Sequence, residues 1–218
     1  MIRKNSIPPA VSLNGKARMV IAHHIIFTAY GFWLPNDPRG SWSDFVRSWE
    51  LYCHGHATKV TARKSLAGAV HDRELRRKQK SSLQYDPVRF SPRQVCCVAR
   101  GFARAVDESK YRVLAFSIMP DHVHGVVARH ANPAERIIGH LKARATQQLV
   151  AERLHPFLDQ CSASGTLPPA WASRGWKVFL DSDADIQRAA DYVQDNPLKQ
   201  VLPRQSWDFV MENRAHVG

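Results

Sequence analysis

Two histidines separated by a single residue, His122 and His124, are the clearest candidates for chemistry in this sequence. They lie in residues 118–127, which read Ile-Met-Pro-Asp-His-Val-His-Gly-Val-Val. Because side chains alternate between the two faces of a β-strand, both imidazoles would point to one face and Val123 into a core. At a rise of roughly 3.3 Å per residue the rings would lie about 7 Å apart, close enough to bind one divalent cation. The alternative is a pair of half-buried histidines that hydrogen-bond to their neighbours.

The charge of the chain indicates a polyanionic partner. Lys and Arg number 31 against 19 Asp and Glu, which gives a net charge of +12. Nucleic acid is the simplest such partner, because phosphate contacts release counterions; no lipid-anchor motif supports the rival, an anionic membrane. Residues 59–80 hold eight basic and two acidic residues, half of the net charge. A solvated basic helix is the alternative, but we predict DNA contacts here from Arg63, Lys64, Arg73, Arg76, Arg77, Lys78 and Lys80.

Length and composition predict one domain in a soluble protein. We expect it to span residues 18–200, with a basic insertion at about 50–90 and flanking segments at 1–17 and 201–218. The four cysteines form no Cys-x-x-Cys pair, and no apolar run is long enough to span a bilayer. The first residues lack the apolar core of a signal peptide. We therefore predict a cytoplasmic protein without a membrane partner.

Apolar periodicity and capping residues predict the elements that must position the histidines. Helices are expected at 68–80, at 91–106 after Ser91, at 133–154 after Asn132, and at 183–195 before Asn196-Pro197. Strands are expected at 18–30, 111–119, 122–128 and 175–180, with one more possible from 205 onwards. This order predicts an α+β fold of the ferredoxin-like split βαβ type, an antiparallel sheet with helices on one face. The histidine strand would lie near the middle of the sheet and face the helix at 133–154.

Three tryptophans, Trp33, Trp42 and Trp49, are interleaved with Arg39 and Arg47 in a turn-dense segment. Such a pattern is able to stack nucleic-acid bases. We favour the alternative, in which these tryptophans fill the core beneath a long loop.

Several motifs together resemble the single-tyrosine transposases of the HUH nuclease superfamily, which include REP-associated tyrosine transposases and small insertion-sequence transposases. The resemblance covers residues 20–200. It is carried by Met119-Pro-Asp-His-Val-His-Gly-Val-Val127, by Ile138-Gly-His-Leu-Lys-Ala-Arg-Ala-Thr146, by the Trp-containing segment 171–179, and by Tyr192-Val-Gln-Asp-Asn-Pro-Leu-Lys199.

The resemblance implies a DNA enzyme with a metal site. It implies binding of hairpin or single-stranded DNA, with Lys142 and Arg144 contributing, and attack by a tyrosine that leaves a 5′-phosphotyrosine and a free 3′-OH. His122 and His124 would hold Mg²⁺ or Mn²⁺, which polarises the phosphate. Hard cations prefer oxygen ligands, and in such enzymes the third ligand comes from the next helix. Gln147 and Gln148 are the candidates here, with Glu152 one turn further on.

The sequence departs from this family at the nucleophile. The family's tyrosine belongs on the helix after the histidine strand, but no tyrosine stands between Tyr111 and Tyr192. Tyr192 and Tyr30 are the remaining candidates. Three functions therefore stay open: a transposase with a displaced tyrosine, a degenerate protein that binds DNA hairpins without cutting, and a hydrolase in which metal-bound water replaces the tyrosine. A homodimer is compatible with each of them.

Overall fold

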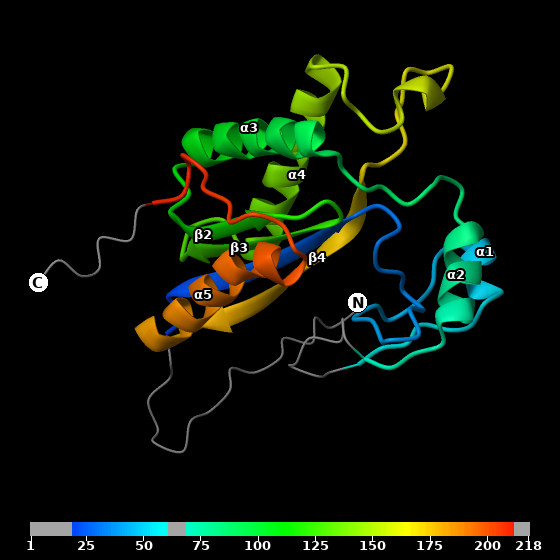
Figure 1. Ribbon diagram of the computed structural model, residues 1–218, viewed down its shortest axis with the longest axis horizontal. Helices are drawn as coiled ribbons and strands as arrows, with labels where there is room; N and C mark the ends of the chain where they lie inside the picture. The colour runs from blue at the N-terminus through cyan, green and yellow to red at the C-terminus, as the bar shows by residue number, and fades with distance from the viewer. Residues whose placement is uncertain (1–18, 61–68, 212–218) are drawn as a thin grey trace, which may run out of the picture.

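Four antiparallel strands form the central sheet in the computed structural model, which describes residues 19–60 and 69–211 (Figure 1). The order across the sheet is β2-β3-β1-β4. The strands are β1 Ala22–Ala29, β2 Val113–Ile118, β3 His122–Ala128 and β4 Trp171–Leu180. The predicted α+β class and antiparallel sheet are confirmed, and the histidine strand β3 lies between β2 and β1. Within the described residues the helices are α1 Trp49–Tyr52, α2 Arg73–Ser81, α3 Pro92–Ser109, α4 Ala134–Ala151 and α5 Asp183–Lys199, with a 3-10 helix η1 at Leu158–Gln160.

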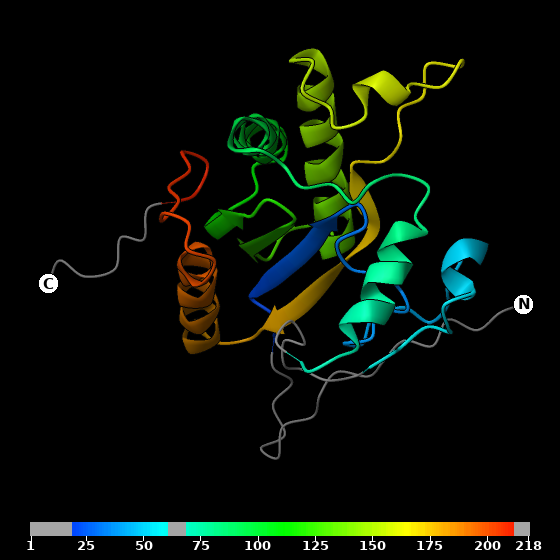
Figure 2. The ribbon, with the colours of Figure 1, turned by 45° about the vertical axis from the view of Figure 1, so that its right-hand side comes forward.

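Helices α3 and α4 cover one face of the sheet and enclose the larger apolar core (Figure 2). The core includes Phe27, Val123, Phe102 and Leu141, each at most 1% exposed. The two helices approach each other closely at Gly101, where a Cβ would lie 2.6 Å from the Cα of Ala145. Burial of this surface is the main source of stability for the sheet.

Helix α5 lies on the opposite face of the sheet. The expectation that the helices cover one face therefore holds for α3 and α4 but not for α5. It begins after Ser182, whose side chain accepts from the Asp185 amide, and packs Ala189 and Val193 against Val126. The expectation that His122 and His124 face the helix at 133–154 is wrong: they face α5. The apolar pattern showed which residues are buried, but not which helix covers them.

Residues 30–60 and 69–90 form an insertion beside the sheet, with α1 and α2 side by side (Figures 1 and 2). Buried hydrogen bonds hold it together. The Asn36 side-chain amide donates to Leu51 O at 2.6 Å, and Gln79 donates to Asn36 O at 2.8 Å. Arg39 donates twice to the Asp37 carboxylate, at 2.8 Å each, and Arg76 donates to it at 3.3 Å. The loop and the basic helix α2 are thus one structural unit.

Several predicted boundaries differ from the structure. Helix α5 continues through Asn196-Pro197 to Lys199, because a proline so near the helix end removes only one hydrogen bond. The N-cap of α4 is Pro133 rather than Asn132. The expected last strand is reduced to an isolated bridge between Val210 and Val113. Arg63, Lys64 and the segments 1–17 and 212–218 lie outside the described residues. No helix in the described ranges is long and apolar enough to cross a membrane.

Candidate functional site

His122 and His124 lie side by side on the α5 face of the sheet, with ring centroids 5.1 Å apart. Their neighbours across the β1–β3 ladder are Thr28 and Ile26. Both histidines are largely buried, at 9% and 7% exposed. Alternation along β3 sends Val123, between them, into the opposite core.

The His122 ring is oriented from three sides. Its Nδ1 lies 2.7 Å from an oxygen of Asp121, and Asn196 Nδ2 lies 3.3 Å from its Nε2. Phe32 from the insertion stacks on the ring at 5.2 Å and 13°. Because the carboxylate accepts the Nδ1 proton, Nε2 keeps its lone pair, which is the arrangement found in carboxylate–histidine–metal sites.

Asp121 is held ionised by its neighbours. Burial alone would raise the pKa of this carboxyl, but the hydrogen bond from His122 and the nearby charge of Arg89 outweigh it, and the pKa is lowered. Arg89 contacts the second carboxylate oxygen at 2.7 Å. Asp121 therefore remains an acceptor that fixes His122.

A third histidine, His24 on β1, completes the cluster. Its Nε2 lies 3.0 Å from His124 Nδ1. Burial lowers the pKa of His24 to about 4 and the pKa of His124 well below its usual value. Both rings are neutral at pH 7, and when His124 donates its Nδ1 proton to His24, its Nε2 is free to bind a cation.

Tyr192 on α5 lies over this cluster. Its ring centroid is 5.5 Å from that of His124 and 5.9 Å from that of His24. The Lys199 ammonium sits 4.2 Å from the centre of the tyrosine ring. With 36% of its surface exposed, Tyr192 is accessible to a substrate. Tyr30 instead packs against Tyr85 and Phe157, beside the core under α3 and α4.

The donors around His122 fit a single divalent cation only if an amide joins the histidines. No group of three His, Cys, Asp or Glu side chains able to hold a metal ion occurs in residues 19–60 and 69–211. The two histidines provide two nitrogens, and rotation of the Asn196 amide would place its oxygen near His122 Nε2 as a third donor. Two imidazoles favour Mn²⁺ over the harder Mg²⁺.

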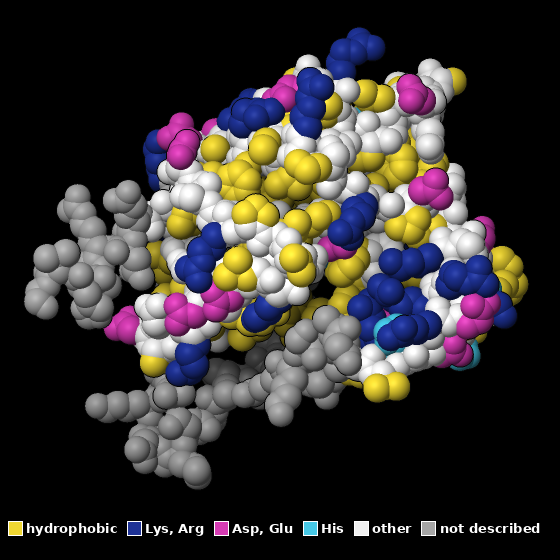
Figure 3. Space-filling model, viewed as in Figure 1, with side chains coloured by type: hydrophobic (Ala, Val, Ile, Leu, Met, Phe, Trp, Pro, Cys, Tyr) yellow, Lys and Arg dark blue, Asp and Glu magenta, His cyan; other side chains and the backbone are white. Residues whose placement is uncertain are grey.

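The basic helix α2 lies next to this site. Lys80 approaches the Phe32 ring at 5.7 Å, and Phe32 in turn stacks on His122. Burial, with the charges of Arg76 and Arg39, lowers the pKa of Lys80. A cavity of about 400 Å³ on this helix is lined by His71, Arg73, Arg76, Arg77 and Lys80. Figure 3 shows Lys and Arg side chains gathered here.

The structure does not bring the α4 candidates to the histidine pair. Gln147 accepts from Arg144, and Gln148 donates to Glu152 at 2.8 Å. Arg144 pairs with Glu108 of α3, while Lys142 donates to the carbonyls of Ala172 and Arg174. Arg73, Arg76, Arg77 and Lys80 share the cavity on α2. Glu74 pairs with Arg77 at 2.7 Å and with Lys78 at 4.0 Å.

Sequence reasoning missed His24 and Asn196 as members of the site. His24 alternates with Ile25 in the first strand, so strand periodicity alone would have placed it on one face with Ile26. Its contact with His124 depends on β1–β3 pairing, which the pattern does not reveal. Asn196 was interpreted as a helix end, and its place beside His122 follows from α5 crossing the sheet.

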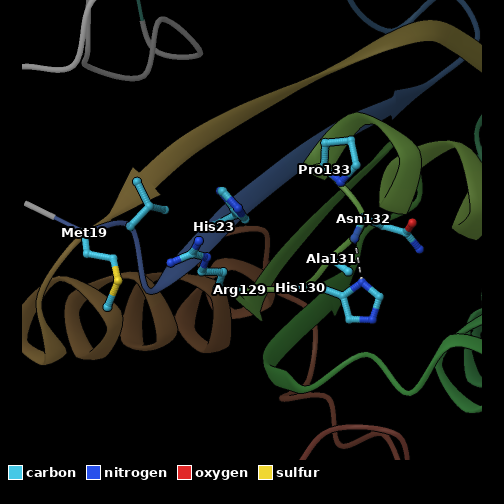
Figure 4. A pocket seen from close by; sticks show the side chains of 8 residues that line it. Met19, His23, Arg129, His130, Ala131, Asn132 and Pro133 are labelled. Atoms are coloured by element: carbon cyan, nitrogen blue, oxygen red, sulfur yellow. Dashed lines mark hydrogen bonds between the residues drawn. The ribbon is translucent and has the colours of Figure 1, made fainter.

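A second cavity, of about 370 Å³, lies at the other end of β1 (Figure 4). It is lined by Met19, His23, Arg129 and the 130–133 turn. His23 is adjacent to His24 but points to the opposite face of the strand. This cavity is therefore separate from the histidine cluster.

No protein-family model and no curated protein matches the chain. Among solved structures, it is similar to a REP-associated tyrosine transposase bound to a REP hairpin, with 10% identity and a TM-score of 0.43 over 87% of this chain and 74% of that one. It is also similar to a provisionally named transposase from Deinococcus radiodurans R1, with 9% identity and a TM-score of 0.37 over 81% and 91% of the two chains. Both of these proteins are named as transposases. Neither likeness decides the activity of this chain, which depends on its own residues.

Proposed function

We propose that this protein is a transposase-like enzyme that nicks and rejoins single-stranded or hairpin DNA, with Tyr192 as the nucleophile. The observation that carries the proposal is the position of Tyr192, whose ring lies 5.5 Å from His124. The accessible phenol and the two oriented imidazoles share one side of the sheet. This is the pairing of nucleophile and phosphate-binding group that strand transfer requires.

In the proposed reaction the Tyr192 oxygen attacks the scissile phosphorus and the bond to the 3′-oxygen breaks. The phenol loses its proton, the departing 3′-oxygen gains one, and a 5′-phosphotyrosine bond forms. The Lys199 ammonium, 4.2 Å from the centre of the Tyr192 ring, would stabilise the negative charge that develops on this side chain. Attack of a 3′-OH on the phosphotyrosine reverses these changes and rejoins the strand.

His122, His124 and the Asn196 amide would hold a divalent cation, Mn²⁺ or Mg²⁺. When bound, it would withdraw charge from the scissile phosphate. Asp121 and His24 orient the two imidazoles, and Phe32 covers His122 from the insertion side. The reaction is proposed to occur in the cytoplasm, and the oligomeric state is left open.

The basic residues of α2 would bind the DNA backbone next to the site. Arg73, Arg76, Arg77 and Lys80 line one cavity, and Lys80 lies within 5.7 Å of the ring that stacks on His122. Phosphates beyond the scissile one would therefore meet concentrated positive charge.

The test is covalent adduct formation on a labelled hairpin oligonucleotide with Mn²⁺. Wild-type protein is expected to give a denaturation-resistant protein–DNA band, and Tyr192→Phe is expected to lose it by about a thousandfold or more. Tyr30→Phe is the matched control and is expected to retain it. Undiminished adduct in Tyr192→Phe would exclude Tyr192 as the nucleophile.

A second candidate is a DNA hairpin-binding protein without strand cleavage. It is favoured by the absence of a three-residue His, Cys, Asp or Glu metal group in the described parts of the chain. It predicts salt-sensitive DNA binding that survives His122→Ala. Any Mn²⁺-dependent adduct or strand scission by the purified protein would exclude it.

A further inference from the structure

Three aromatic side chains lie exposed within eight residues of the insertion. Phe45, Trp49 and Tyr52, here termed the aromatic platform, are 48%, 71% and 42% exposed. The rings of Trp49 and Tyr52 stack on each other at 5.8 Å and 23°. Large aromatic rings are costly to leave in water, so such a group indicates a binding surface.

Two arginines lie beside the Phe45 ring of the platform. The Arg47 guanidinium lies 5.0 Å from the centre of the Phe45 ring, and that of Arg174, on β4, lies 5.9 Å from it. Asp44 is paired with Lys59, and Glu50 accepts from Ser48 at 2.5 Å. Aromatic faces beside arginines suit a nucleobase and its phosphate, and fit the net charge of +12.

The platform is held firmly on the protein. Leu51 is the buried residue of α1, and Asn36 donates to the carbonyls of Leu51 and Gly55. Trp42, just before Phe45, is stacked between Trp33 and Trp176 of β4, at 6.1 Å and 4.5 Å. A preformed surface of this kind loses little conformational entropy when a ligand stacks on it.

The same stack links the platform to the histidine site. Trp176 pairs with Ile26 in the β1–β4 ladder, and Ile26 pairs with His124 in the β1–β3 ladder. One row of side chains therefore runs from His124 through Ile26 to Trp176, on which Trp42 of the insertion stacks. The segment that carries Phe45 thus follows directly on a tryptophan stacked on the strand next to β1.

We propose that the aromatic platform binds unpaired bases of a single-stranded DNA segment next to the position of cleavage. The inference rests on the proposed function for the identity of the polymer, but its site and residues are separate from Tyr192 and the histidines. Stacking of this kind tolerates any base, because every base has a π-face. The platform would thus select unpaired over paired DNA rather than a sequence.

The experiment measures binding of fluorescein-labelled oligo-dT by the full chain, with a blunt duplex of equal length as the second probe. Trp49→Ala is expected to weaken oligo-dT binding by about 5-fold to about 150-fold, the range for one base stacked on an aromatic ring, with little change for the duplex. Trp49→Tyr restores a ring and is expected to recover most of the affinity. Phe45→Ala is expected to act in the same direction.

Phe179→Ala is the matched control. Phe179 is 57% exposed and has Lys177 over its ring at 5.3 Å, but it lies outside the platform. It is expected to bind oligo-dT like the wild type. Equal losses for Trp49→Ala and Phe179→Ala, equal losses on both probes, or no loss at all would overturn the proposal.

The alternative occupant of such a surface is a second copy of this chain. Sedimentation of the wild type and of Trp49→Ala tests whether the platform forms a dimer interface. A wild-type dimer that Trp49→Ala dissociates would overturn the proposal. Failure of the proposed function looks different: oligo-dT binding remains sensitive to Trp49→Ala while no adduct forms at Tyr192.

Discussion

The two faces of the sheet are built from different chemistry. The face under α3 and α4 is filled with apolar side chains such as Phe27, Phe102 and Leu141, all almost fully buried. The face under α5 buries three histidines, His24, His122 and His124, together with Asn196. Apolar burial stabilises the fold, whereas buried polar groups cost free energy unless they are hydrogen-bonded. The contrast indicates that the α3 and α4 face mainly stabilises the fold, whereas the α5 face carries the candidate site.

The largest expected effects are opposite in kind for two adjacent residues of β3: one change reduces DNA cleavage and the other reduces stability. His122→Gln, on the α5 face, keeps most of the side-chain volume and a hydrogen-bonding amide, and is expected to reduce DNA cleavage by about a thousandfold or more, because it removes a phosphate-site ligand, with little loss of stability. Val123→Ala, on the other face, is expected to lower the free energy of unfolding by about 2 kcal/mol and leave cleavage by the folded protein intact. Cleavage assays and urea denaturation check the pair. Similar losses of stability in both variants would break the contrast between the faces.

A smaller effect is expected from acid. The pKa of His24 is about 4 in the fold, against 6.5 as its usual value. Below pH 6.5 the unfolded chain takes up a proton that the folded chain does not, so stability is full above pH 6.5 and falls toward pH 4, by about 3 kcal/mol in total.

Urea denaturation in chelator between pH 7 and pH 4.5 measures this dependence. His24→Gln is expected to show a shallower fall in unfolding free energy than the wild type. Ile26→Val, on the same face, is the packing control, with a lower stability but an unchanged slope. Parallel profiles for His24→Gln and the wild type would show that His24 is not held neutral by burial.

The smallest effect concerns the α2 cavity. Arg73 and Arg77 line it, whereas Lys78, on the same helix, does not. The double variant Arg73→Ala/Arg77→Ala is expected to reduce the magnitude of the slope of log K against log salt by about two, with weaker binding to all sequences. Lys78→Ala loses one charge outside the cavity and is expected to change the slope by less than one. Equal changes per charge would mean that α2 acts through net charge alone.

Much of the fold followed from local patterns. The strand 122–128 and the first helical turn after Ser91 were predicted because alternation, β-branching and an N-cap serine followed by proline are local signals. The place of α5 over the histidines was not, because burial patterns do not say which partner buries a residue. Pro197 was interpreted as a stop signal, yet the helix includes it, and this hid Asn196 from the site.

Only the part of the site that lies within one short stretch of sequence was predictable. The spacing of His122 and His124 in the chain was enough to place them on one face. Gln147 and Gln148 were suggested from the following helix, but that helix packs on the other side of the sheet. Tyr192 is 68 residues from His124 in sequence, and only the crossing of α5 over β3 brings the two rings within 5.5 Å.

The most direct test of the account is to map the residue that carries DNA after reaction with a hairpin oligonucleotide and Mn²⁺. Nuclease and protease digestion followed by mass spectrometry identifies the peptide with an attached nucleotide. The account predicts a phosphotyrosine at Tyr192. A nucleotide on any other residue, or cleaved DNA with free 5′-phosphate ends and no modified peptide, would contradict it.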